Sequence, residues 1–152
     1  MSQGEMSASP EANEDDDSIA VWPLIGPKHS KTSGMDRGQA RVVLAPSQVS
    51  WVEIKGHLME LYTATGENYV LRGTLKSLQQ WWAKHNFVRI HNSYLVSLAH
   101  VRKLRATPRG GWKVYLTFGA EQLALPISRR RLSEFKQLWT DHVEAQYEKS
   151  FY

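Results

Sequence analysis

The sequence contains no cysteine, which excludes a disulfide framework and any metal site built on thiolates. It also lacks an apolar run close to the roughly 18 residues that a membrane helix needs. Its N-terminus has neither the basic start nor the apolar core of a secretory signal. We therefore expect a soluble protein of a reducing compartment, the cytoplasm.

Motifs of catalysis and metal binding are absent as well. There is no glycine-rich phosphate loop, no Gly-x-Ser-x-Gly element and no motif of paired carboxylates. Of the six histidines, His85, His91 and His100 do not have the i, i+4 spacing of a helical zinc pair. The sequence therefore predicts no enzyme, no cofactor and no metal site.

Charge is unevenly distributed along the 152 residues. Residues 1–40 carry 3 Lys or Arg against 7 Asp or Glu, whereas residues 41–152 carry 16 against 8. A basic domain behind an acidic segment indicates a polyanionic partner, usually a nucleic acid. A basic domain without such a partner is the plainer alternative.

Residues 1–40 are expected to form an acidic, disordered tail in front of a folded domain of residues 41–152. Ser, Glu and Asp dominate the first 17 residues and leave almost nothing apolar to bury. One short apolar cluster around Trp22 can dock on the domain. The acidic run 14–17 either keeps the chain soluble, which we favour, or competes with a nucleic acid for the basic face.

From residue 41 the pattern is that of short strands separated by turns. A stripe at Leu75, Leu78 and Trp82 predicts a helix near 75–85 with Thr74 as N-cap, and a second apolar stripe predicts a helix at 129–145. Trp81, Trp82, Trp112 and Trp139 fall on apolar faces and are predicted core residues. Strands are predicted at 41–44, 49–54, 58–63, 68–72, 87–90, 94–104, 112–118 and 121–126. The fold is thus mainly β, without a helix-turn-helix pair.

Two motifs in this frame resemble a known family. Residues 87–101 read Phe-Val-Arg-Ile-His-Asn-Ser followed by an apolar strand, and residues 125–131 read Leu-Pro-Ile-Ser-Arg-Arg-Arg. Both resemble signatures of the LytTR family of DNA-binding domains, in the right order and with a hairpin of suitable length between them. Residues 49–54 followed by Gly56-His57 resemble the family's first strand and loop. The resemblance covers about residues 41–138.

The resemblance implies an elongated β-sandwich of small antiparallel sheets that binds double-stranded DNA. Family members insert loop residues into successive major grooves, often as two copies on direct repeats. The positions that contact bases correspond here to His57, Asn92 and Arg130. The candidates for contacts with the DNA backbone are Lys55, Arg89, His91, Ser93, Ser128, Arg129 and Arg131.

The chemistry of these residues agrees with that role. Asn92 can pair with the edge of adenine, and an arginine can pair with guanine O6 and N7. Ser128 is a candidate N-cap, but three arginines follow it, and cations in a first helical turn oppose the helix dipole. A phosphate bound there reverses the sign of that effect. For His91, a structural hydrogen bond to a backbone carbonyl is an equal alternative.

Three further alternatives stay open. The cations Arg102, Lys103, Arg105 and Arg109 either widen the basic surface or protect an edge strand, and we favour edge protection. The rival class is a β domain that binds single-stranded nucleic acid or a protein partner. Most LytTR proteins carry a receiver domain or a membrane segment. Residues 1–40 are too short and too polar for either, so the signalling partner is unknown.

Overall fold

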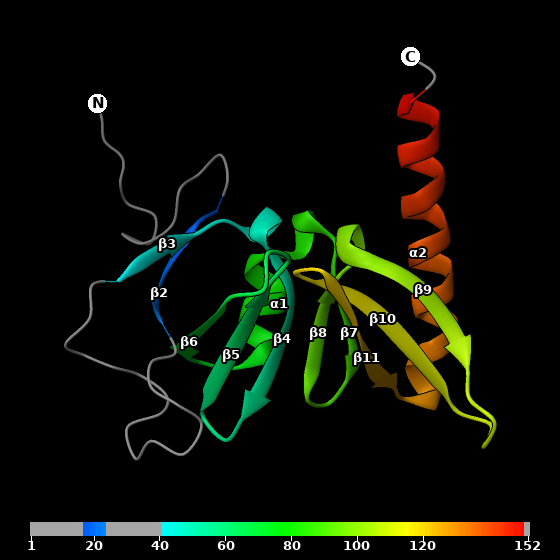
Figure 1. Ribbon diagram of the computed structural model, residues 1–152, viewed down its shortest axis with the longest axis horizontal. Helices are drawn as coiled ribbons and strands as arrows, with labels where there is room; N and C mark the ends of the chain where they lie inside the picture. The colour runs from blue at the N-terminus through cyan, green and yellow to red at the C-terminus, as the bar shows by residue number, and fades with distance from the viewer. Residues whose placement is uncertain (1–16, 24–40, 151–152) are drawn as a thin grey trace.

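The computed structural model describes residues 17–23 and 41–150 as two antiparallel sheets and two α-helices. The fold is mainly β, as predicted (Figure 1). A three-stranded sheet has the order β11 (Glu121–Ile127), β10 (Trp112–Phe118), β9 (Val101–Ala106). A seven-stranded sheet has the order β3 (Val42–Leu44), β2 (Ile19–Pro23), β6 (Asn68–Arg72), β5 (Leu58–Thr63), β4 (Val49–Lys55), β8 (Tyr94–Ser97), β7 (Phe87–His91). The helices are α1 (Leu75–Trp81) and α2 (Arg129–Ser150).

The central strands of the large sheet are buried on both faces. In β4, Val52 belongs to a core with β2 and α1, whereas its neighbour Trp51 belongs to a second core. That second core also holds Leu116 of β10 and Phe135 of α2. Since successive side chains of a strand point to opposite faces, one strand serves both cores. The two cores fix β4, β7 and β8 rigidly, and with them the turns at their ends.

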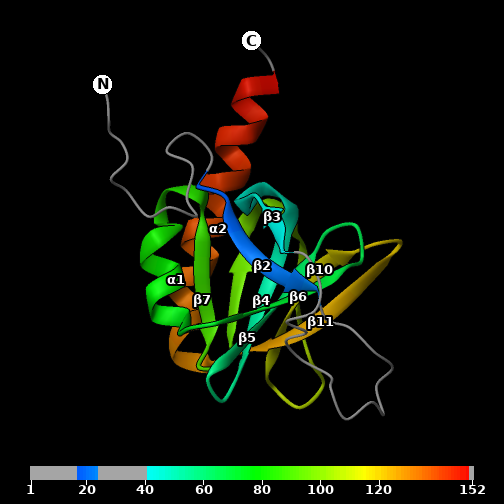
Figure 2. The same cartoon turned by 90° about the vertical axis from the view of Figure 1, so that its left-hand side faces the viewer.

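Strand β2 lies inside the segment that was expected to be a tail. It pairs with β3 and β6, and the side chains of Ile19 and Val21 are 1% and 0% exposed (Figure 2). The expectation of disorder is wrong for this strand, because its two apolar residues fill the core that Leu44 lines from β3. The remaining positions of the expected tail, 1–16 and 24–40, lie outside the described residues.

Asp17 fixes the start of β2 beside the residues that precede β7, at the opposite end of β7 from Asn92. Its carboxylate lies 2.8 Å from His85 Nε2 and 3.3 Å from Lys84 Nζ, and its carbonyl accepts a hydrogen bond from the Trp82 indole. The hydrogen bond with His85 is the main cause of a lowered pKa of Asp17. Asp17 is therefore held away from the residues expected to bind DNA. The other residues of the acidic run are not described.

The strand predicted at 94–104 is interrupted. A 3-10 turn, Leu98–His100, separates β8 from β9, and it carries the chain from the large sheet to the small one. The Leu98 side chain is buried, its backbone N–H donates to the carbonyl of Asn86, and His100 Nε2 lies 2.9 Å from the carbonyl of Ser47. The apolar pattern runs through this turn unbroken, which is why the sequence did not show it.

Helix α1 begins as predicted, because Thr74 Oγ1 accepts a hydrogen bond from the backbone N–H of Ser77. Trp82 is fully buried, but the prediction that Trp81 is a core residue is wrong, since 38% of its side chain is exposed. Trp81 lies one position off the stripe of Leu75, Leu78 and Trp82, about 100° around the helix.

Helix α2 is covered only over its first part. Phe135 is fully buried, while Leu138 and Val143 are 36% and 47% exposed. The C-terminal part of the helix extends past the sheets (Figure 1). In the described part of the chain, neither helix has the length and apolar character needed to cross a membrane.

Candidate nucleic-acid interface

Three connections meet at one edge of the fold: the β4–β5 turn, the β7–β8 turn and the junction between β11 and α2 (Figure 1, lower edge). Strand pairing puts Glu53 opposite Tyr94, and the backbone N–H of Ile54 donates to the carbonyl of Ser93. The N–H of Ser128 donates to the carbonyl of Ile90 at 2.8 Å. These pairings bring together the three connections that carry the ten residues predicted as base or backbone contacts.

The β4–β5 turn presents His57. Lys55 pairs with Leu58, so only Gly56 and His57 form the turn, and Gly56 has a φ of +65° that favours glycine. The His57 side chain is exposed, while its carbonyl accepts a hydrogen bond from the N–H of Gly73. The backbone is thus held from behind, and the imidazole is left at the surface.

Lys55 stands beside this turn with 56% of its side chain exposed. Its ammonium lies 3.4 Å from the carboxylate of Glu60. Such an exposed ion pair contributes little to stability. Lys55 is therefore able to exchange this carboxylate for another anion.

The β7–β8 turn presents Asn92, and Arg89 holds that turn. The Arg89 guanidinium donates to the carbonyl of His91 at 3.1 Å and to the carbonyl of Asn92 at 2.8 Å. The Asn92 side chain is exposed and makes no hydrogen bond within the described residues. The amide is thus presented by a turn whose backbone is fixed.

His91 and Ser93 complete the turn. His91 Nδ1 accepts a hydrogen bond from the N–H of Ser93, and the ring lies against Tyr94 at 5.3 Å between centroids. The ring therefore has a local structural role, but its partner is a backbone N–H and not the backbone carbonyl that the sequence analysis offers as the alternative. Because Nδ1 accepts, the neutral ring carries its proton on Nε2, which remains a donor.

The arginine run opens α2. Arg129 and Arg130 are exposed and Arg131 is half-buried, and no acidic residue stands in the first turn of this helix. The predicted N-cap is not made by the Ser128 side chain, because its buried hydroxyl has no partner. The backbone carbonyl of Ser128 accepts from the N–H of Arg131 instead, which closes the turn without the side chain.

Arg131 and Arg89 are electrostatic neighbours. Burial, and then the charge of Arg131, lower the pKa of Arg89. The Nε of Arg131 is buried without a hydrogen-bond partner. The two guanidinium groups thus repel each other, and no carboxylate among the described residues forms an ion pair with either. Such a pair is suited to an external anion.

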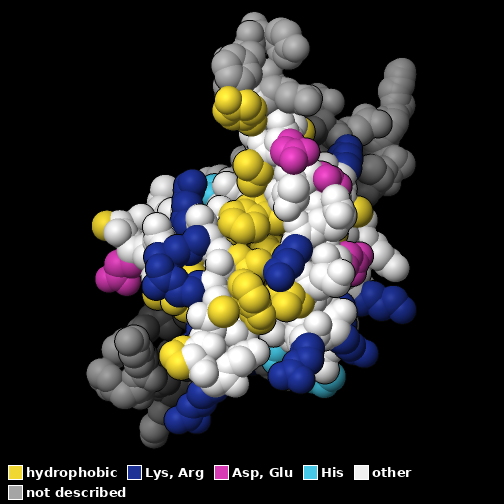
Figure 3. All heavy atoms as spheres, turned by 90° about the vertical axis from the view of Figure 1, so that its right-hand side faces the viewer, with side chains coloured by type: hydrophobic (Ala, Val, Ile, Leu, Met, Phe, Trp, Pro, Cys, Tyr) yellow, Lys and Arg dark blue, Asp and Glu magenta, His cyan; other side chains and the backbone are white. Residues whose placement is uncertain are grey.

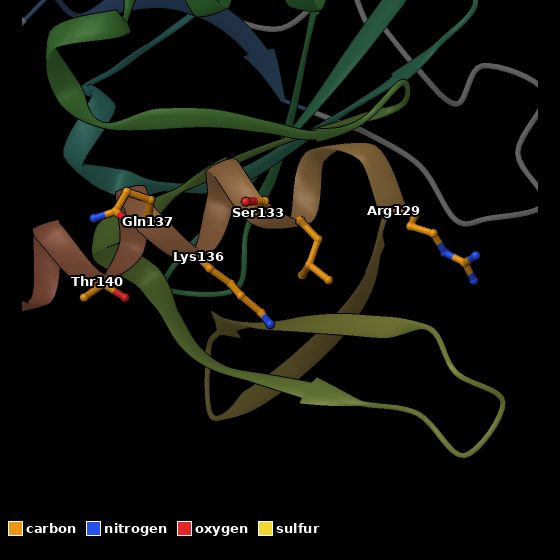
Figure 4. A pocket seen from close by; sticks show the side chains of 6 residues that line it. Arg129, Ser133, Lys136, Gln137 and Thr140 are labelled. Carbon is orange, nitrogen blue, oxygen red and sulfur yellow. The ribbon is translucent and has the colours of Figure 1, made fainter.

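Arg129 lies on another side of the helix. It lines a groove along α2 with Leu132, Ser133 and Lys136, whose ammonium lies 4.3 Å from the ring of Trp112 (Figure 4). It also lines a hollow with Gly110 and Gly111 of the β9–β10 turn. The three arginines thus face different neighbours, a division that a run of identical residues does not reveal.

The motif predicts these residues as a group, and their contact with DNA stays a prediction. It does not indicate that Arg89 holds the β7–β8 turn. The position of Arg89 two to three residues before a turn is the only local signal of that role. The hydrogen bonds to the two carbonyls depend on the exact path of the turn.

Within residues 17–23 and 41–150 the fold is mainly β, carries polar and basic turns at one edge and has no helix-turn-helix pair. This is the architecture that the resemblance to DNA-binding domains implies. The chain matches the model of the LytTr DNA-binding domain over residues 39–140, and it belongs to that family.

Known relatives agree with this assignment. The chain is 33% identical over 101 residues to the CO-responsive transcriptional regulator RcoM of Rhodospirillum rubrum, covering 66% of this chain and 42% of that protein. It is 24% identical over 102 residues to the sensory transduction protein LytT of Enterococcus faecalis, covering 66% of this chain and 40% of that protein. The chain therefore spans less than half the length of these relatives.

The fold is also known from a solved structure. A LytTr DNA-binding domain from Bacillus cereus superposes with a TM-score of 0.58 at 16% identity, covering 78% of this chain and 95% of that domain. At this identity the likeness concerns the fold.

Proposed function

We propose that the chain is a cytoplasmic transcription regulator that binds specific sites in double-stranded DNA. Binding uses the edge that carries the β4–β5 turn, the β7–β8 turn and the junction between β11 and α2. His57, Asn92 and Arg130 contact bases from three separate connections, all exposed on that edge. The observation that carries the proposal is the fixed β7–β8 turn, in which Arg89 binds the backbone and leaves the Asn92 amide unpaired.

The remaining residues of the edge bind the DNA backbone. Arg131 and Arg89, whose charges repel each other in the free protein, bind phosphate at the start of α2, where no acidic residue stands in the first turn. Arg89 uses the guanidinium hydrogens that its two carbonyl partners leave free. Contacts from Lys55, His91, Ser93 and Arg129 extend the footprint on either side. The predicted contact from Ser128 is not proposed, because its hydroxyl is buried and its N–H donates to the carbonyl of Ile90.

The arrangement suits one face of a duplex. The three connections stand side by side on rigid strands, so each can enter a groove without a conformational change. Two copies on direct repeats would double the contact. Neither copy needs a catalytic step or a cofactor.

The test is selection of bound sequences from a random double-stranded library with the full chain. A fragment that begins at residue 41 is unsuitable, because it lacks β2 and its core residues. We expect enrichment of a short motif. Equal recovery of random and selected duplexes, or preferential binding of single strands, would contradict the proposal and favour the single-strand class.

Lys84→Gln is the matched control. Lys84 lies before β7, at the opposite end of that strand from Asn92. The substitution therefore removes one positive charge without changing the edge that carries the three connections. It should select the same motif with the same affinity. Arg130→Gln, with the same loss of charge, should alter the motif at the bases it contacts.

A further inference from the structure

Five cations and a single acidic residue occupy the sequence of the three-stranded sheet and its turns, residues 101–127. Two of the cations are engaged, because Arg102 donates to Thr117 and Lys103 lies 4.8 Å from the ring of Tyr115. Three other side chains make no hydrogen bond, ion pair or ring contact within the described residues: those of Arg105, Arg109 and Lys113. We call these three the hairpin cations.

Protection of an edge strand does not explain the hairpin cations. β9 is an edge strand and carries Arg105, but Lys113 belongs to β10, the central strand, and Arg109 belongs to the turn. Arg105 and Lys113 are also directly opposite in the strand pairing. Like charges in that position repel each other and destabilise the hairpin. An anion between them removes that cost.

The hairpin cations surround a shaped hollow. It has a volume of about 500 Å³ and is lined by Arg105, Thr107, Arg109, Lys113 and Tyr115, among others. Its floor is well ordered by the turn, in which Thr107 N–H donates to the carbonyl of Gly111 at 2.7 Å and Gly110 N–H donates to the carbonyl of Thr107. The Thr107 hydroxyl accepts from the N–H of Gly111. The cations are thus mounted on a fixed turn.

This turn lies on the same side of the molecule as the DNA-binding edge. Gly110 and Gly111 line one hollow together with Arg129, the first residue of α2. The turn reaches the lower margin of the fold beyond the start of α2 (Figure 1). Lys and Arg side chains are distributed over this side of the molecule, including its left and lower margins (Figure 3). The β9–β10 turn therefore adjoins the arginine run at Arg129.

We propose that Arg105, Arg109 and Lys113 bind the phosphate backbone of duplex DNA that flanks the recognition site, on the side of Arg130. The inference rests on the proposed function and adds a fourth contact to the three connections. The hairpin cations bind phosphates and no bases, because the hollow is lined by cations and hydroxyls rather than by an amide fork. They lengthen the footprint on one side only, so the two flanks of the site are not equivalent.

The first test uses the unmodified full chain and the selected motif in three duplexes. The first duplex ends close to the motif on both sides. The second is extended by about one helical turn on one side only, and the third by the same length on the other side only. We expect tighter binding only for the extension on the side read by Arg130, with a steeper salt dependence. Each phosphate contact that forms releases counterions and contributes about 0.9 to the magnitude of the slope of log K against log salt. Three such contacts should make the slope for this extended duplex steeper by about 2 to 3 than the slope for the short duplex.

The second test is the triple variant Arg105→Gln, Arg109→Gln, Lys113→Gln. It should select the same motif and lose the effect of the flank. Its melting temperature should stay the same or rise, since the variant removes repulsion and no contact. Lys84→Gln should keep the effect of the flank.

The outcomes separate the two proposals. If no motif is enriched with the unmodified chain, the proposed function fails. If the motif is enriched but both flanks act alike, or the triple variant responds to the flank as the unmodified chain does, the inference about the hairpin cations is wrong.

Discussion

The guanidinium of Arg89 donates a hydrogen bond to the backbone carbonyl of Asn92 at 2.8 Å, and a second one to the carbonyl of His91. One strand residue thus holds the turn from which an exposed amide projects. The proposed reading of DNA depends on this relationship, because an amide can discriminate a base edge only from a defined position.

Arg89→Lys should therefore impair site discrimination although it preserves the charge. An ammonium cannot reproduce the planar fork that binds two carbonyls. We expect a loss of about 1 kcal/mol in unfolding free energy, because water can replace hydrogen bonds at this half-buried position. Urea denaturation measures the stability, and competition between selected and random duplexes measures the discrimination. If Arg89→Lys binds and discriminates as the unmodified chain does, the fork has no positioning role.

Asn92→Ala and Arg130→Ala should lower discrimination more than they lower binding to random DNA. Each bidentate contact with a base contributes about 1–3 kcal/mol, so affinity for the selected site should fall roughly 5- to 150-fold. Lys55→Ala should instead weaken all duplexes alike and reduce the salt slope by about 1. Equal weakening of selected and random DNA by Asn92→Ala and Arg130→Ala would show that these residues do not read bases.

The salt response of the unmodified chain provides an independent check. A domain that neutralises about five to seven phosphates should show a slope of log K against log salt of roughly −4 to −6. Titrations at several salt concentrations give this slope. A flat response would remove the electrostatic basis of the interface, whatever the sequence preference.

Val21→Ala tests whether β2 belongs to the folded domain. Val21 is fully buried between β3 and the core, so we expect a loss of about 1–3 kcal/mol of unfolding free energy. Val43→Ala is the matched control, because the Val43 side chain on the neighbouring strand is 69% exposed. Its effect should stay within about 0.5 kcal/mol. Equal effects in urea denaturation would mean that β2 does not pack on the core.

The lowered pKa of Asp17, the residue at the start of β2, predicts how the unfolding free energy depends on pH. A carboxyl whose pKa is lowered by folding stabilises the folded state above its ordinary pKa of 3.8, and this contribution is lost as the pH falls through the folded pKa. Unfolding free energy should therefore decline below about pH 4, and less steeply in Asp17→Asn. Denaturation curves between pH 3 and 6 test this. Parallel declines would show that Asp17 makes no contribution.

Periodicity predicted most of the fold because most strands have one apolar and one polar face. β10 and β5 alternate cleanly, and both begin and end where the pattern predicts. The turn at Leu98–His100 escaped because its apolar residues continue the alternation of the flanking strands. β2 escaped because five residues between polar segments provide too little pattern. Both depend on pairing with distant strands.

The candidate site also has one part that the sequence predicts and one part that it does not. A motif predicts Asn92 and the arginine run, since each lies within a short segment of sequence. The hydrogen bond from Ser128 N–H to the Ile90 carbonyl and the electrostatic contact of Arg131 with Arg89 join segments far apart in the chain. Composition and spacing contain no information on these contacts. The absence of a Ser128 side-chain cap follows from the same packing, which buries the hydroxyl.

Arg131→Gln separates stability from binding. In the free protein Arg131 stands beside Arg89, lies in the first turn of α2 and leaves its Nε without a partner, so its charge is unfavourable. We expect unfolding free energy to stay constant or to rise by up to about 1 kcal/mol. DNA affinity should fall for all duplexes, with a salt slope smaller by about 1, because a phosphate contact is lost. Arg129→Gln, which removes the same charge from an exposed side chain, should affect binding similarly but leave stability unchanged. A clear loss of stability in Arg131→Gln would instead assign Arg131 to the packing of the helix start, and its closeness to Arg89 would then have no bearing on an anion.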